Sequence, residues 1–273
     1  YISSYLTNRD NWKPKKLLCN GGIVHQGNVT LGSGFVLAND EAESFIKQNQ
    51  ECRRVVLPYL RGQDINRDPR QQPTEWVINF WDWSADKAKS LFPQVFQHVE
   101  RTVPSERNNM KSMGGACDTY WLHLWNRSEL YHQVGRGHDF ERHPFEHWNK
   151  VALLERVIVF ARAATKYCCF SIVPNIYVYS DSLCVVAKFG FGLFATLSSD
   201  IHCVWAWEHG SKMKQDLRYS HGDVFETFPF PTGVLEEKNH SLRELGKAFF
   251  ESRSEYLQEN KKGMTKFYNE YHD

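Results

Sequence analysis

The residues best suited to specific chemistry lie in one charged stretch, Lys212-Met213-Lys214-Gln215-Asp216-Leu217-Arg218-Tyr219-Ser220. If this stretch is a single β-strand, side chains two residues apart share a face. Lys214, Asp216 and Arg218 then form a row, with Lys212 beside them. Lysine and arginine can donate to guanine O6 and N7, and aspartate can accept from cytosine N4. The row fits a surface that reads base pairs, although composition alone favours an ordinary solvated strand face.

Two other motifs have weaker chemical interpretations. Gly32-Ser33-Gly34-Phe35 could be a cofactor loop, but such loops leave a hydrophobic strand and open a helix. The segment before it, residues 25–30, is too short and too polar to be such a strand, so a structural turn is expected. Glu236-Glu237-Lys238 contains half of a nuclease motif, with Asp223 upstream. Because it follows a proline-rich stop rather than lying on a strand, we interpret it as a chance match.

Histidines and cysteines do not form a convincing metal site. His138, His143 and His147, with Cys117 and Glu146 nearby, have loosely metal-like spacing, but no second Cys/His pair accompanies them. We therefore expect no metal, and hydrogen-bonded or solvated histidines in the stretch 135–150. The seven cysteines include adjacent Cys168-Cys169 and no CxxC pair. Reduced thiols in a cytoplasmic protein are the expected state.

The sequence contains no motif of covalent catalysis. It lacks a G-x-S-x-G elbow, a Walker loop, an HExxH motif and the Asn/Asp-Pro-Pro-aromatic loop of adenine methyltransferases. We expect no catalytic residue and no bound cofactor in this chain.

Composition indicates a globular protein of one large or two small domains. The chain has 273 residues, of which 41% are hydrophobic and 24% are charged, and its formal net charge is +1. Any nucleic-acid site must therefore be a local patch. No apolar run approaches the roughly 20 residues that span a bilayer, so no membrane partner is expected. The chain begins at Tyr1 and is interpreted as an excised piece of a larger protein.

The expected elements are those of an α+β fold. A helix begins near Asn39 or Asp40, strands cover 55–60 and 75–83, and Ser84 caps a helix that reaches residue 99. Four closely spaced strands follow over 156–163, 167–173, 176–179 and 183–189. One helix over 191–205 precedes the charged strand. In the tail, Leu242, Leu245, Phe249 and Tyr256 form an apolar helical stripe, which Gly263 ends.

Several stretches together resemble the target-recognition region of MmeI-like (type IIL) restriction-modification proteins. These proteins join an endonuclease, an N6-adenine methyltransferase and a specificity domain in one polypeptide. The order and spacing of the stretches carry the resemblance, which covers nearly the whole chain. The stretches are residues 31–37 (LGSGFVL), 57–65 (LPYLRGQDI), 76–83 (WVINFWDW), 155–159 (ERVIV), 198–202 (SSDIH), 217–220 (LRYS), 225–231 (FETFPFP) and 264–273 (MTKFYNEYHD).

The resemblance implies three segments with different roles. Residues 1–20 would be a linker from a methyltransferase domain, 21–231 an α+β DNA target-recognition domain with a mixed sheet, and 232–273 a helical segment. The larger protein would use S-adenosylmethionine, and Mg²⁺ if it also cuts DNA. In this family the positions two and four residues before the arginine of Arg-Tyr-Ser vary together with one recognised base pair. Here these are Asp216 and Lys214, which implies a G·C pair, and Arg218 matches a base-contacting position.

The partners implied are double-stranded DNA and the methyltransferase domain, whose target adenine would be flipped. Basic residues elsewhere would hold the DNA backbone. Two rival functions remain open, a protein-interaction module of a phage-defence complex and a stand-alone metal-dependent nuclease. The expected phosphate contacts are Arg53, Arg54, Arg61, Arg107, Lys111 and Lys212.

Overall fold

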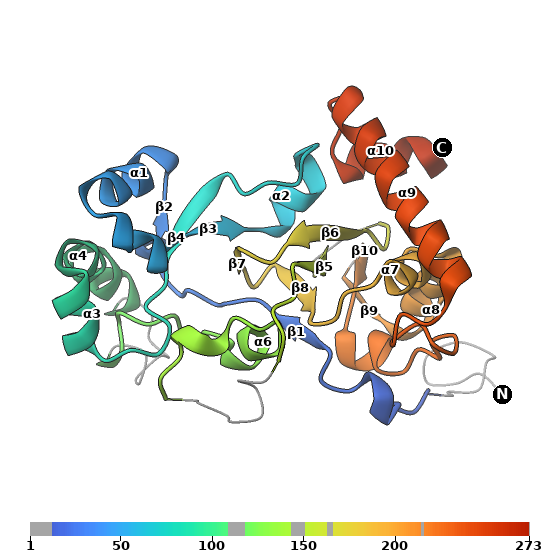
Figure 1. The fold of residues 1–273 in the computed structure, drawn as a ribbon, viewed down its shortest axis with the longest axis horizontal. Coiled ribbons are helices and arrows are strands. Elements are labelled where there is room, and N and C mark those ends of the chain that lie inside the picture. Colours follow the sequence, from blue (N-terminus) through green and yellow to red (C-terminus); the bar gives the residue numbers. More distant parts are fainter. Residues whose placement is uncertain (1–12, 109–117, 143–150, 163–165, 214–215, 273) are drawn as a thin grey trace.

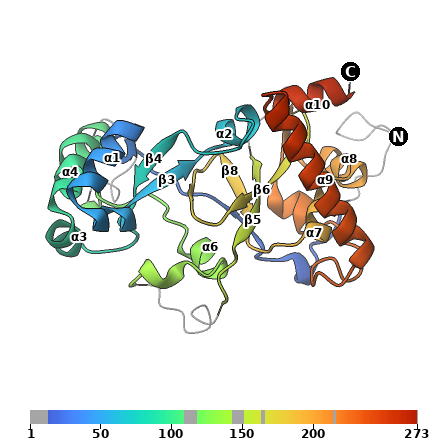
Figure 2. The same cartoon turned by 45° about the horizontal axis from the view of Figure 1, so that its top comes forward.

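The computed structural model describes residues 13–108, 118–142, 151–162, 166–213 and 216–272. Its helices and sheets confirm the α+β class. The molecule is elongated, with one group of helices at each end and the strands between them (Figures 1 and 2). No helix in these ranges is both long and apolar enough to cross a bilayer.

A four-stranded antiparallel sheet occupies the centre, with strand order β1-β8-β5-β6. Successive side chains along its strands point alternately into two hydrophobic cores. On β5, Val157 and Val159 face a first core, whereas Ile158 and Phe160 face a second. Because both faces are covered, strands β5, β6 and β8 are almost continuously apolar, whereas the edge strand β1 is partly polar. The strands are β1 (Val24–Gln26), β5 (Arg156–Ala161), β6 (Phe170–Pro174) and β8 (Leu183–Val186).

The first core lies under a second sheet, with order β2-β4-β3-β7, and its helices. Strand β7 comes from the C-terminal half of the chain and pairs in parallel with β3, which ties the two halves together. The elements of this part are η2 (Ser33–Phe35), β2 (Val36–Leu37), α1 (Asn39–Gln48), η3 (Gln50–Arg54), β3 (Val56–Leu60), α2 (Gly62–Arg67), β4 (Glu75–Ile78), α3 (Ala85–Leu91), α4 (Pro93–Asn108), α6 (Ser128–Gln133), η4 (Gly137–Asp139) and β7 (Val178–Tyr179).

Three boundaries in this part differ from the sequence prediction. Helix α1 has Ala38 as its N-cap, and the Ala38 N–H donates to Glu41 Oε2 at 3.1 Å. Strand β4 ends at Ile78, because residues 79–83 turn to bury Trp81 and Trp83. Ser84 does cap α3, but the helix stops at Leu91 and α4 begins anew at Pro93, where proline lacks the N–H a continuous helix needs.

The second core holds the helices at the C-terminal end. The expected helix over 191–205 is two helices, α7 (Phe191–Leu197) and α8 (Asp200–His209). The break lies at Ser198 and Ser199, where the Ser199 hydroxyl accepts from the His202 N–H at 3.3 Å and caps α8. The remaining elements are η1 (Leu18–Asn20), β9 (Ser211–Met213), β10 (Asp216–Arg218), η5 (His221–Phe225), α9 (His240–Glu259) and α10 (Met264–His272).

The tail is helical as predicted, and half of the predicted apolar stripe of α9 faces the second core. Leu242 and Phe249 pack against that core, whereas Leu245 is 62% exposed and Tyr256 is 37% exposed. The fully buried residues of α9 are Gly246, Arg253 and Leu257. Gly246 lets α9 approach α7, since a Cβ there would lie 2.0 Å from the Phe191 carbonyl oxygen. A count of apolar residues could not place a glycine and an arginine on the buried face.

A buried histidine joins the second sheet to the segment after α4. The His123 Nε2–H donates to the Ile78 carbonyl at 2.8 Å, and Nδ1 accepts from the Asn28 side chain at 3.0 Å. Both contacts are satisfied when the ring is neutral. Burial lowers the pKa of His123 to about 4, and the nearby Arg107 cation acts in the same direction.

We predict that this histidine makes folding sensitive to mild acid. The folded-state pKa lies below the unfolded value of about 6.5. Its contribution is therefore fully present above that unfolded value and is lost as the pH falls towards 4. The slope is at most about 1.4 kcal/mol per pH unit. Urea unfolding of the wild type and of His123→Gln at pH 7 and pH 5 should show a smaller pH effect in the variant. Equal pH effects in the two proteins would contradict the assignment.

Candidate nucleic-acid interface

The charged stretch over 212–220 is a hairpin rather than a single strand. Strand β9 pairs antiparallel with β10, with Lys212 opposite Leu217 and Ser211 opposite Arg218. Asp216 and Arg218 share a face, as predicted, because they are two residues apart on β10. Lys212 lies on the other strand and on the other face, so the prediction that it stands beside them is wrong. Lys214 connects the strands in sequence and lies outside the described residues.

The hairpin is anchored in the second core by the residues between its charged ones. Leu217 is 1% exposed and Tyr219 is 5% exposed, whereas Arg218 is exposed. The Tyr219 hydroxyl shares a 3.1 Å hydrogen bond with His202 Nε2 on α8. Burial lowers the pKa of His202 to about 3, so this ring is neutral near pH 7. The outward side chains therefore stand on a rigid support.

Asp216 and Arg218 have no ion pair with any other residue that the structure describes. Arg218 is exposed and Asp216 is half-buried on the same face of β10, opposite to the buried Leu217. The strand thus presents a guanidinium, which can donate hydrogen bonds, beside a carboxylate, which can accept them. This arrangement retains the base-reading chemistry expected from the sequence.

Arg53 and Arg54 lie in η3, on one side of a cleft of about 680 Å³. Arg136 also lines this cleft and donates to the Tyr177 carbonyl at 2.6 Å. Arg54 lies 4.0 Å from an Asp139 carboxylate oxygen, and Arg53 is exposed. Arg53 is thus accessible to a phosphate, whereas Arg54 already has an acidic neighbour, and the role of both as phosphate contacts stays a prediction.

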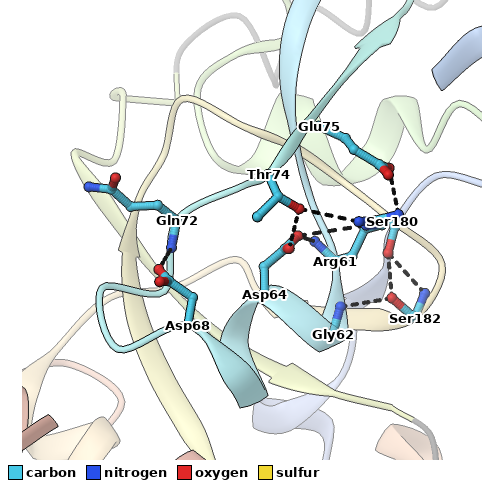
Figure 3. Close-up of polar contacts among 9 residues, drawn as sticks. All are labelled: Arg61, Gly62, Asp64, Asp68, Gln72, Thr74, Glu75, Ser180 and Ser182. Carbon is cyan, nitrogen blue, oxygen red and sulfur yellow. Dashed lines mark hydrogen bonds and ion pairs between the residues drawn. The ribbon is translucent and has the colours of Figure 1, made fainter. Parts of the chain in front are cut away.

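Arg61 holds the corner between β3 and α2 (Figure 3). Its guanidinium lies 2.5 Å from Glu75 Oε2 and 3.7 Å from Asp64 Oδ2, and the backbone N–H of Arg61 donates to Asp64 Oδ2 at 2.9 Å. Thr74 donates to the other Asp64 oxygen at 2.9 Å. Two carboxylates thus balance the charge of Arg61. The motif 57–65 positions a chain reversal, and this arginine is not available as the phosphate contact that was predicted.

Arg107 is also a structural residue, and its predicted role as a phosphate contact is wrong. It is 1% exposed, and its guanidinium donates to the carbonyls of Thr30, Leu31, Thr119 and Leu122 at 2.7–3.3 Å. The sequence offered no sign of this, because a buried arginine and a surface arginine look alike in a polar segment. Lys111 lies outside the described residues.

The structure adds an exposed aromatic site that the sequence did not reveal. Trp125 is 52% exposed, and the Arg127 guanidinium lies 4.8 Å from its ring centroid. Both line a cavity of about 420 Å³ with His25 and with His221, which follows the hairpin. An exposed Trp–Arg pair of this kind can contact a sugar or a base. Its residues come from three distant segments, which explains why no motif marked it.

The Gly32-Ser33-Gly34 turn does not fit a nucleotide cofactor. The Ser33 N–H donates to Glu106 Oε2 at 2.6 Å, and a Cβ at Gly34 would lie 2.3 Å from Thr102 Oγ1. This turn is thus packed against α4, as the structural interpretation expects.

Glu237, in the candidate nuclease motif, also has a structural contact. Its carboxylate accepts from the Gly192 N–H in the first turn of α7 at 3.2 Å. Within the described ranges, no three His, Cys, Asp or Glu side chains are grouped to hold a metal ion.

Residues 123–232 match the family model described as "MmeI, target recognition domain". This range includes the central strands β5, β6 and β8, helices α7 and α8, and the whole hairpin.

Among solved structures, the chain is similar to the type IIL restriction-modification enzyme MmeI in complex with DNA, with 14% identity and a TM-score of 0.62. The match covers 92% of this chain and 30% of that one. At this identity the likeness establishes the fold, and the chain spans less than a third of that enzyme. With the family match, it confirms the resemblance to MmeI-like proteins. A comparison with curated proteins finds no match.

We predict that Arg107 contributes to stability rather than to DNA affinity. Arg107→Met leaves four carbonyls, one buried and three in partly buried contacts, without their donor and should lower the free energy of unfolding by about 3 kcal/mol. Arg101→Met, an exposed change on the same helix, should shift it by less than about 0.5 kcal/mol. Denaturant unfolding measures both. If Arg107→Met unfolded like the wild type and flattened the salt dependence of DNA binding by about one unit, Arg107 would be a phosphate contact after all.

Proposed function

We propose that this chain is the DNA specificity domain of a type IIL-like restriction-modification protein. The observation that carries the proposal is the β9-β10 hairpin, within the range that matches the target recognition domain, with Asp216 and Arg218 directed outward. We propose that this hairpin enters a DNA groove and that its outward side chains contact base edges.

The proposal assigns different tasks to different residues. Lys214, Asp216 and Arg218 read bases, with Lys214 on guanine and Asp216 on the paired cytosine. Arg53, Arg54 and Lys212 hold the backbone, which supplies affinity but no sequence information. The Arg53–Arg54 cleft and the exposed position of Lys212 support this assignment.

In the larger protein, this domain would position an N6-adenine methyltransferase domain over its target adenine, which is flipped out of the duplex. S-adenosylmethionine would then be bound by that other domain, and Mg²⁺ would be needed if the protein also cleaves. The support for this step is the likeness to an enzyme of which the chain covers about a third.

The function is tested by selecting duplexes from a random pool with the purified chain, and by cleavage assays with Mg²⁺. A specificity domain enriches one motif, binds with an affinity that falls steeply with salt, and does not cleave. Binding with no enriched motif would contradict the proposal, and sustained cleavage would favour the nuclease. Methylome sequencing of a host that expresses the larger protein would report its motif and its modified base together.

We predict that Lys214 and Asp216 set one base pair of the target. Exchanging their chemistry, with Lys214→Glu and Asp216→Arg, should change the preferred pair from G·C to C·G, because the carboxylate then seeks cytosine where lysine sought guanine. Loss of one such contact costs about 1–3 kcal/mol, or roughly ten- to hundredfold in preference. The selected motif is the readout.

The matched control is Lys212→Glu, which changes charge on the opposite face of the same hairpin. It should weaken binding to all sequences without altering the motif. A double variant that still selects the original motif with undiminished preference would show that this hairpin does not read bases.

A further inference from the structure

A cavity of about 710 Å³ lies between α2 and α10. Among the residues that the structure describes, its lining includes three basic side chains and no carboxylate. Figure 2 shows these two helices side by side. Arg67 comes from the end of α2, Lys261 from the turn before α10, and Lys266 from α10 itself. The other side chains include the amides of Gln63 and Asn66 and the hydroxyl of Thr265, all of which can donate hydrogen bonds.

The three cations form no close ion pair within the described part of the chain, although neighbouring basic residues do. The larger contribution to lowering the pKa of Glu270 comes from its hydrogen bond with Lys262, and Lys266 contributes a smaller part. Lys262 is 2.6 Å from a carboxylate oxygen of Glu270. Asp68 lines the adjacent cavity instead, and there it accepts from the Gln72 N–H at 2.8 Å (Figure 3). The closest polar contacts of Glu270 and Asp68 are therefore with groups other than the three cations.

The packing of the tail fixes these cations relative to one another. A Cβ at Gly263 would lie 2.5 Å from the carbonyl oxygens of Asn66 and Arg67, so only glycine allows this close contact between the turn and α2. Met264 and Tyr268 bury α10 against the rest of the chain. Cations held in a concave site concentrate positive potential and attract an anion.

We propose that this cavity binds a phosphate group of the DNA backbone, an inference that rests on the proposed function. The helical tail then contributes to DNA affinity as well as to packing. Since phosphates carry no sequence information, Arg67, Lys261 and Lys266 raise affinity for all duplexes alike.

The experiment measures binding of the full 273-residue chain to a labelled random-sequence duplex over a range of salt concentrations. The test variant is Lys261→Gln with Lys266→Gln, at two exposed positions. Two lost phosphate contacts should reduce the salt slope by about 1.8 and weaken binding about fivefold each at physiological salt. The variant Lys261→Arg with Lys266→Arg should retain the wild-type affinity and salt dependence, because it keeps both positive charges.

The matched control, Lys47→Gln with Lys262→Gln, removes the same charge from two lysines that pair with acids, and should leave the slope unchanged. If the test and control variants have equal slopes while the wild type binds DNA, the cavity is not a phosphate contact and the proposed function still stands. A wild-type chain that binds no duplex overturns both. In that case, inorganic phosphate that shifts the amide resonances of Thr265 and Lys266 would identify a site for a small anion instead of DNA.

Discussion

The structure depends on a central sheet that is buried on both faces. Along β5 and β8, alternate side chains enter two different hydrophobic cores, so a slip of one residue would exchange the two sets. Val157 and Val159 are enclosed by the N-terminal part of the chain, and Ile158 and Phe160 by the C-terminal helices. Neither core can be completed without the sheet, which makes the two ends of the molecule one folding unit.

Buried polar side chains extend this frame into the irregular segments. Loops packed against the cores carry buried or partly buried carbonyl groups, and these need hydrogen-bond donors from the protein. Arg107 supplies four such contacts, and the Asn175 amide donates to the carbonyls of Val134 and Leu154, both at 2.9 Å. Arg253 on α9 donates to the Phe170 carbonyl at 2.7 Å and to the Tyr268 hydroxyl at 3.1 Å. The tail is therefore attached to the central sheet by a charged hydrogen bond as well as by apolar packing.

The sequence could predict features that depend on a pattern within one segment, but not those that depend on contacts between distant segments. Three of the four central strands, β5, β6 and β8, were predictable because a strand covered on both faces is continuously apolar, whereas β1 is short and partly polar and was not predicted. The Ser84 cap was predictable from its residue type. The hairpin was missed because it joins two three-residue strands, too short to show a period. Within the candidate site, the shared face of Asp216 and Arg218 followed from spacing alone. The burial of Arg107 and the grouping of Arg67 with Lys266 are tertiary facts, and no local pattern encodes them.

The hairpin separates the residues that hold the fold from those that face outward. Leu217 and Tyr219 point into the second core and fix the position of β10. Asp216 and Arg218 alternate with them, and their charges are not used by the described part of the protein. Because a strand has a period of two, outward residues can be exchanged without changing those that are buried. A base-reading surface built in this way can acquire a new preference while its support stays the same, whereas a reader built from core residues would lose stability with each change.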